Sequence, residues 1–380
     1  MPVTQGARAI WLLAAVLTAC AADSSEPTAS PVPTTVVRAE SELSTVPPRV
    51  EGDLVLAGPA LVGNIGLAQL EVVTGDIRIE DTDQLESVAL PALRQVGAEL
   101  SVFANRMLRS VSLPKLEACG ALAVKSNLGL TELPLPVLRQ ADSLVVRDNV
   151  SLRRVAAPVL QESADESAAG VLRSSVEVTH NPALVELTLP SLRELTRLWV
   201  AKNLSLRELR LPGLSRAGAI TITGELLDIL SLPSLVELSG EPGTSSLVDA
   251  PRLTLLELPK LQEASGLQVS AARLRSMELP ALERVEGFGV ASPVLDRFSA
   301  PHLTDLRGEL DRQVTLPRAH RYDLDALTNG CERLRLVGGF PDCALPSIVP
   351  ACSVRALPPS EVRKGCTCDA RGDVTSASCH

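Results

Sequence analysis

Few side chains in this 380-residue sequence are spaced so that they could perform acid–base or metal chemistry. Glu80, Asp81 and Asp83 are the nearest approach to a carboxylate cluster, but they surround one expected turn and have no matching acids in adjacent segments, so we interpret them as solvated turn charges. No nucleophile elbow, phosphate loop or His-Glu-x-x-His segment occurs. Four histidines are far apart and lack metal-ligand spacing: His180, His302, His320 and His380. The sequence therefore predicts no catalytic residue, no metal site, no cofactor and no enzyme activity.

One cysteine is placed for lipid attachment. An apolar run begins at Ala9, is too short to span a bilayer, and ends in Leu17-Thr18-Ala19-Cys20, which is similar to the lipobox of bacterial lipoproteins. We therefore expect residues 1–19 to be a signal peptide and Cys20 to be acylated. Ordinary cleavage after a small residue is the alternative. Asp directly after the acylated cysteine would suggest retention in the inner membrane, so Ala21 at this position favours the outer membrane or the cell surface. The expected location is thus the cell envelope, with the membrane as a partner through the N-terminal lipid.

The other cysteines divide into two groups. Cys119 stands alone in the central region, where we expect a buried thiol that packs as a small apolar side chain. An even count near the C-terminus of an exported chain predicts up to three disulfides, whose pairing the sequence leaves open. These six are Cys331, Cys343, Cys352, Cys366, Cys368 and Cys379. We expect residues 329–380 to form a disulfide-rich cap on the preceding domain.

Composition narrows the class of partner. The chain has 36 Lys and Arg against 45 Asp and Glu, and only 2% of its residues are aromatic. An acidic chain with so few stacking side chains is not suited to nucleic acid. Hydrophobic residues make up 45% of the chain, which indicates a folded protein. Residues 20–50 are rich in Pro, Ser and Thr, so we expect a disordered tether there.

A repeat extends over most of the remaining sequence and is marked by asparagines followed nine residues later by proline. Apolar residues precede each asparagine by five and three positions and follow it at plus three, plus six and plus eleven, so that Leu130, Leu152 and Leu184 are equivalent. Thr82 occupies the asparagine position one repeat earlier, and later repeats of about 21 residues lack asparagine. The markers are Asn105, Asn127, Asn149, Asn181 and Asn203, separated by 22, 22, 32 and 22 residues.

This spacing predicts a solenoid. Apolar residues two apart place one strand face inward, and a proline in every repeat disfavours helix. One coil alone cannot bury enough apolar surface to offset its ordering entropy, whereas stacked coils can. We therefore predict a mostly β, right-handed parallel β-helix or leucine-rich-repeat-like solenoid of about eleven coils over residues 51–328. The asparagines are expected to stack as a ladder along the axis, the alternative being exposed turn asparagines.

The repeat frame Leu-x-Val-x-x-Asn-x-x-Leu-x-x-Leu-x-Leu-Pro-x-Leu resembles that of the receptor L domain, over roughly residues 54–320. Ordinary leucine-rich repeats need a further leucine eight residues before the asparagine. That position holds Gly97, Cys119, Ala141, Arg173 and Leu195, which favours the L-domain-like form. The resemblance implies a partner-binding surface on the solenoid.

Six residues at outward positions of the first strand could form that surface, because exposed aromatic side chains flanked by cations are typical of recognition sites. The alternative is that any sheet surface needs some large side chains. The six are Phe103, Lys125, Arg147, His180, Trp199 and Lys202. Insertions at residues 161–175 and at Gly240–Thr244 are expected to bulge from one corner. The predicted function is non-catalytic binding or adhesion to a protein or glycan. A structural envelope protein and a β-helix polysaccharide lyase or hydrolase are the alternatives.

Overall fold

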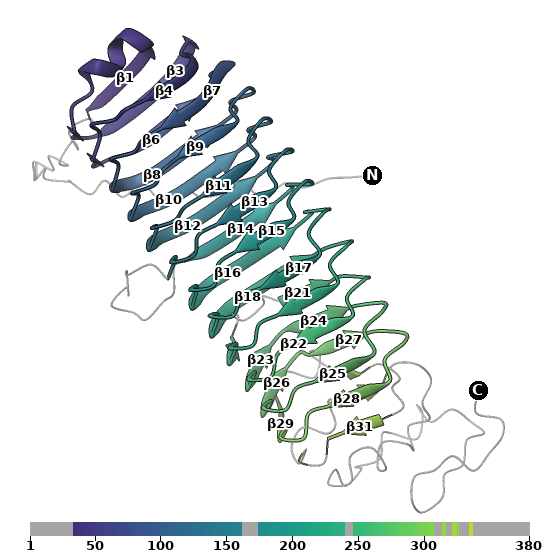
Figure 1. Ribbon diagram of the computed structural model, residues 1–380. Coiled ribbons are helices and arrows are strands. Elements are labelled where there is room, and N and C mark those ends of the chain that lie inside the picture. Colours follow the sequence, from purple (N-terminus) through teal and green to yellow (C-terminus); the bar gives the residue numbers. More distant parts are fainter. Residues whose placement is uncertain are drawn as a thin grey trace, which may run out of the picture. The chain divides into compact units, whose positions relative to one another are not determined.

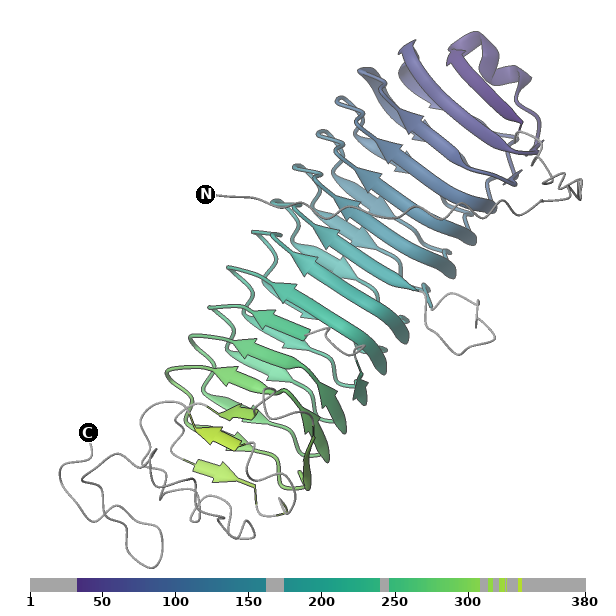
Figure 2. The ribbon, with the colours of Figure 1, turned by 180° about the vertical axis from the view of Figure 1, so that it is seen from behind.

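The computed structural model describes residues 33–161, 174–239 and 246–307, and a few short segments up to residue 336. These residues form an almost all-β parallel solenoid of about 12 turns, so the predicted fold class is confirmed. Figure 1 shows successive strands lying side by side in the order of the sequence, and Figure 2 shows the same progression from behind. All strand pairs of the described residues are parallel. The strands form three ladders, one on each side of the coil.

The first ladder holds the strands that precede the asparagine positions. Each strand pairs with its counterpart in the next coil, so that Leu122 lies opposite both Leu100 and Leu144. Its members are β1 (Thr34–Ala39), β3 (Asp53–Ala60), β6 (Ile77–Glu80), β8 (Gln95–Phe103), β10 (Ala118–Lys125), β12 (Gln140–Arg147), β14 (Ser175–Thr179), β16 (Glu194–Ala201), β18 (Arg216–Thr223), β21 (Ser246–Asp249), β24 (Leu267–Ser270), β27 (Gly289–Ala291), β30 (Val314–Leu316) and β32 (Leu334–Leu336).

The second ladder holds the short strands predicted at the plus-six positions. It is divided into three sheets of six, three and three strands. The first comprises β4 (Val62–Gly66), β7 (Gln84–Ala89), β9 (Ser110–Ser112), β11 (Glu132–Pro134), β13 (Arg154–Ala156) and β15 (Glu186–Thr188). The others comprise β17 (Glu208–Arg210), β19 (Ile229–Ser231) and β22 (Leu255–Glu257), then β25 (Ser276–Glu278), β28 (Arg297–Ser299) and β31 (Arg321–Asp323). The five marker prolines lie in the turns that follow this ladder, as predicted.

The third ladder was missing from the sequence-based description. The long strands β8, β10, β12, β16 and β18 bend, and their first residues pair on this side while their last residues pair in the first ladder. Separate short strands complete the ladder: β2 (Arg49–Val50), β5 (Val72–Val73), β20 (Glu237–Leu238), β23 (Glu263–Ser265), β26 (Arg284–Glu286) and β29 (Asp305–Arg307). In β8, β10 and β18 a glycine lies at the bend, and a Cβ on Gly218 would lie 2.5 Å from the Thr196 carbonyl oxygen.

The core is a set of continuous apolar rows between the ladders. Leu130, Leu152 and Leu184 are fully buried and equivalent in three consecutive coils, as the repeat predicted. One frame assignment was wrong: β8 has an extra residue at its bend, and Cys119 therefore pairs with Val96 and not with Gly97. A bulge of one residue is absorbed at the corner, after which the rows resume in register.

Two predicted boundaries are also wrong. The segment Thr34–Ala39 is the first strand of the first ladder and pairs with β3, although it falls in the expected tether over 20–50. It is followed by the 3-10 helix η1 (Glu40–Thr45), and Val37 is 1% exposed, so a Thr/Val-rich strand was concealed by the Pro and Ser around it. At the other end, β32 pairs with β30 inside the expected cap over 329–380. The six C-terminal cysteines, Cys20 and the insertion at residues 162–173 lie outside the described residues.

Cys119 is a free, buried thiol on the third ladder, as predicted. Burial raises the pKa of its thiol to about 12. Because only the thiolate is a good nucleophile, we expect Cys119 to react with an aromatic disulfide reagent at pH 8 more than about a hundred times more slowly in the native protein than in denaturant. Stopped-flow absorbance with and without denaturant measures this ratio. Equal rates in both conditions would contradict the burial.

Candidate binding surface

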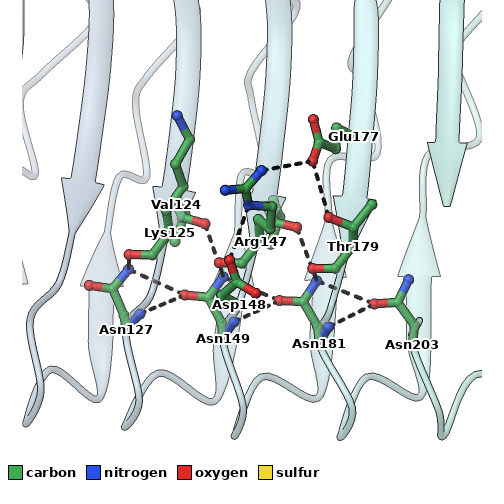
Figure 3. A network of polar contacts seen from close by, with 11 residues as sticks. Val124, Lys125, Asn127, Arg147, Asp148, Asn149, Glu177, Thr179, Asn181 and Asn203 are labelled. Atoms are coloured by element: carbon green, nitrogen blue, oxygen red, sulfur yellow. Dashed lines mark hydrogen bonds and ion pairs between the residues drawn. The ribbon is translucent and has the colours of Figure 1, made fainter. Parts of the chain in front are cut away.

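A row of buried, hydrogen-bonded asparagines, the asparagine ladder, runs beside the ends of the strands of the first ladder (Figure 3). The side-chain oxygen of Asn149 accepts hydrogen bonds from the Asn127 backbone N–H at 3.0 Å and from the Asn127 side-chain amide at 3.3 Å. The Asn149 amide group donates to Val124 O at 2.9 Å, to Arg147 O at 3.0 Å and to Asn181 Oδ1 at 3.2 Å. All five asparagines are at most 2% exposed, which confirms the ladder and excludes exposed turn asparagines.

Thr82 lies at the N-terminal end of the asparagine ladder, as its position in the repeat predicted. It is fully buried, and its hydroxyl donates to Asn105 Oδ1 at 2.6 Å. At the other end, Asn203 Oδ1 accepts from the Asn181 backbone N–H at 3.1 Å. The ladder therefore provides side-chain acceptors for the backbone N–H groups of five consecutive turns, from Thr82 to Asn181.

Each ladder residue is preceded by a residue in the left-handed backbone conformation. These residues have φ between 53° and 59° and are Asp81, Ala104, Ser126, Asp148, His180 and Lys202. A non-glycine residue in this region costs about 1–2 kcal/mol, and the inward turn that it produces brings the next side chain into the ladder. After Asn203 the left-handed residue is deleted, because Thr223 leads directly to Gly224, which takes the asparagine position. The loss of one residue per coil explains the change from 22 to about 21 residues in the later repeats.

The six predicted surface residues fall into two groups. Phe103, Lys125 and Arg147 are directly paired on β8, β10 and β12 and form one row across three coils. The next two positions in this row are Thr179 and Ala201, which are buried. Trp199 lies on a parallel row two residues earlier along β16, and His180 and Lys202 lie on the edge formed by the left-handed residues. The six candidate residues therefore lie on two strand rows and the turn edge beside them.

The charges of the first group are not equally available. Arg147 donates to Asp148 Oδ2 at 3.0 Å and lies 3.9 Å from Glu177 Oε1, so its guanidinium is engaged within the surface. Lys125 projects from the same side of the sheet as Arg147 (Figure 3) and belongs to none of the ion pairs of the described residues. Phe103 is 42% exposed beside Lys125. This row therefore presents one free cation next to one aromatic ring.

The second group is a compact site that we call the Trp199 surface, made of Trp199, Arg197, His180 and Lys202. The indole of Trp199 is 37% exposed, and Arg197 and Lys202 are exposed on either side of it along β16 and the following turn. Neither Arg197 nor Lys202 takes part in an ion pair of the described residues. His180 Nδ1 is buried without a hydrogen-bond partner in the described part of the chain.

The floor beside the indole consists of small side chains. Thr221 is opposite Trp199 on the next coil, and Thr179 and Ala201 occupy the adjacent row and are at most 5% exposed. On the other side, Glu177 is opposite Trp199, and its carboxylate accepts from the Thr179 hydroxyl at 3.1 Å. Trp199 is therefore an exposed ring on a row with Glu177 and Thr221, with exposed Arg197 two residues before it and exposed Lys202 three residues after it.

Sequence reasoning missed Arg197 and an apolar edge. Met107, Leu128, Val150 and Leu204 are 43–47% exposed and follow the ladder residues by one or two positions. Their signal was available, since each interrupts an otherwise polar turn between the asparagine and the plus-three leucine. They form a set of exposed apolar side chains in the turns that follow the first ladder.

The acids and histidines singled out earlier do not converge. Asp81 and Asp83 are exposed, Glu80 is partly buried on β6, and His302 is exposed in a turn far from His180 along the sequence. Among the described residues no three His, Cys, Asp or Glu side chains are grouped so that they could hold a metal ion. His320 and His380 lie outside the described residues.

In the described part of the chain, no helix has both the length and the apolar character needed to cross a bilayer. Comparison with known proteins gives no match to any family model, curated protein or solved structure. A functional assignment therefore depends on the side chains that the solenoid displays.

Proposed function

We propose that this protein is a non-catalytic binding protein of the cell envelope, anchored by lipid at Cys20, and that its Trp199 surface binds an acidic glycan. The carrying observation is the exposed indole of Trp199 above a floor of Thr179, Ala201 and Thr221, flanked by two cations outside any described ion pair. The indole face suits the apolar face of a sugar ring, and Arg197 and Lys202 suit its carboxylates.

The chemistry of the surface favours a glycan over a protein partner. Protein interfaces of standard size bury roughly 800 Å² per partner and are enriched in aromatic residues at their centre. The Trp199 surface offers a single ring, and the whole chain is 2% aromatic. One aromatic ring with two neighbouring cations is sufficient to bind a sugar that carries a carboxylate.

The envelope location is supported by the apolar N-terminal run and by the lipobox-like Leu17-Thr18-Ala19-Cys20. The resemblance of the repeat to receptor L domains also supports a binding role. Intact-mass measurement of the native protein tests the anchor. We expect the mass of a chain beginning at an acylated Cys20, and a chain that retains residues 1–19 would contradict it.

The binding proposal is tested with uronic-acid oligosaccharides and neutral oligosaccharides of the same length. Trp199 is the only tryptophan outside the expected signal peptide, so its emission reports binding directly in the processed protein. We expect the acidic oligosaccharides, and not the neutral ones, to shift this emission. The affinity of the protein for the acidic oligosaccharides should fall as salt is added. Calorimetry should show that Trp199→Ala and the double variant Arg197→Gln/Lys202→Gln each weaken binding at least about tenfold.

Two variants serve as controls. Phe103→Ala removes a similarly exposed ring from another coil. Arg139→Gln removes an exposed cation next to the third ladder. Both variants should bind the acidic oligosaccharides as the parent protein does. If neutral and acidic oligosaccharides bind equally, or if an acidic peptide binds and no glycan does, the glycan assignment is wrong.

A further inference from the structure

The charges of the solenoid are segregated along its axis. Residues 33–102 contain eleven Asp and Glu but four Lys and Arg. The described residues from 103 to 216 contain eight acids and fourteen bases, and the segment 162–173 within that range adds three acids and one arginine. The described residues from 217 to 307 return to eleven acids and seven bases. An acidic block therefore adjoins a basic block at the coil that contains β8.

This boundary coil also carries two exposed apolar side chains. Phe103 and Met107 are 42% and 43% exposed. On the first ladder, Phe103 is paired with Glu80 of the preceding coil and with Lys125 of the following coil. Three consecutive coils therefore place an acid, an aromatic residue and a base side by side in one row: Glu80, Phe103 and Lys125.

We propose that two copies of this chain associate through the first ladder, antiparallel, about a two-fold axis that runs along the strand direction at Phe103. Such an axis reverses the order of the coils and keeps each row opposite itself. Phe103 then faces the same residue of the second copy, and Lys125 of each copy faces Glu80 of the other. The acidic block of each copy covers part of the basic block of its partner.

Glu99 lies on the same face of β8 and faces its own counterpart across the axis, whereas two further pairs of positions bring no like charges together. One coil further out, Arg147 of each copy faces Ala57 of the other. On the adjacent row, Val145 of each copy faces Val55 of the other, and both valines are partly buried. Arg78 brings little free positive charge to the acidic side, because its guanidinium donates to Asp76 Oδ2 at 2.6 Å. A hydrogen bond from the Glu99 backbone N–H and this guanidinium lower the pKa of Asp76, so the pair stays ionised near neutral pH.

The size of the contact predicts a weak dimer. Five strands at ~4.8 Å spacing and about five residues of each strand outline roughly 24 Å by 16 Å, on the order of 400 Å² per partner. This is below the roughly 800 Å² per partner of a standard interface, so association should depend on concentration and on salt. The inference does not depend on glycan binding, because the Trp199 surface lies four coils from Phe103.

Sedimentation velocity of the processed full-length protein, over roughly 5–300 µM at low salt, tests the proposal. We expect a monomer–dimer equilibrium that added salt weakens. Glu80→Lys or Lys125→Glu alone should weaken association about tenfold or more, and the double variant should restore it to within about threefold of the parent. Phe103→Ala should weaken it without changing the melting temperature.

Lys115→Glu is the matched control, since it removes the same charge from the same block at a turn away from the first ladder, and it should leave association unchanged. Trp199→Ala should also have no effect, which separates this proposal from glycan binding. A monomer at every concentration, a dimer insensitive to both single variants, or a double variant as weak as the single ones would each overturn the proposal.

Discussion

Replacing Asn149 by alanine is expected to lower the free energy of unfolding by about 3–4 kcal/mol. The reason is that Asn149 is fully buried and its side chain serves neighbours on both sides. Without it, the Asn127 backbone N–H loses its acceptor, and the Val124 and Arg147 carbonyls lose a donor. Each buried group left unsatisfied costs about 1–3 kcal/mol, although relaxation recovers part of the sum.

Chemical denaturation followed by circular dichroism measures this change. Asn149→Asp should destabilise the protein at least as much at neutral pH, because it places a charge in the ladder and removes both amide donors. Asn64→Ala is the control, since Asn64 is exposed and accepts one hydrogen bond from Ser87, and it should change stability by less than about 0.5 kcal/mol. A change below about 1 kcal/mol for Asn149→Ala would mean that the ladder is not needed for stability.

The second large effect is expected from Leu152→Ala. Leu152 is fully buried in a row with Leu130 and Leu184 of the adjacent coils, and removing its side chain leaves a cavity that these coils cannot fill. We expect a loss of about 2.5–5 kcal/mol. Because each coil contacts only its neighbours, the loss should be local.

Hydrogen exchange with mass spectrometry distinguishes local from global weakening. Protection should fall most in β11, β13 and β15 and much less in β3 or β24. Val150→Ala, two residues away and 47% exposed, should leave exchange unchanged. Equal loss of protection in every coil would show that the solenoid unfolds as one cooperative unit.

The fold could be read from the sequence because solenoid periodicity places equivalent residues in equivalent environments. Leu130, Leu152 and Leu184 recur in one frame, and the structure buries all three. Asn149 could be assigned to a ladder for the same reason, since the amide spacing matches the coil. Two local features were not predicted. β1 was hidden by its flanking Pro and Ser. The third ladder was hidden because small residues such as Cys119 and Ala141 occupy the first part of the long strands β10 and β12.

The candidate surface was harder to predict than the core. Phe103, Lys125, Arg147 and Trp199 lie on the first ladder as expected, whereas His180 and Lys202 lie in the turns after it, and the relation of Trp199 to Phe103 depends on row as well as coil. Arg147 was a reasonable choice by residue type, yet Asp148 and Glu177 engage it. Which charges are engaged by a neighbour is decided by contacts between coils, and one sequence does not specify rotamers.

The left-handed residues beside the asparagine ladder have a consequence for variation. Their backbone is fixed by the turn, none of them is a core residue, and the row from Asp81 to Lys202 already holds acid, small, hydroxyl, imidazole and amine side chains. A substitution can therefore change the side chain at one of these positions in a single coil while the backbone of the solenoid keeps its conformation. The side chains displayed along this edge can therefore diverge between related sequences without a change of fold.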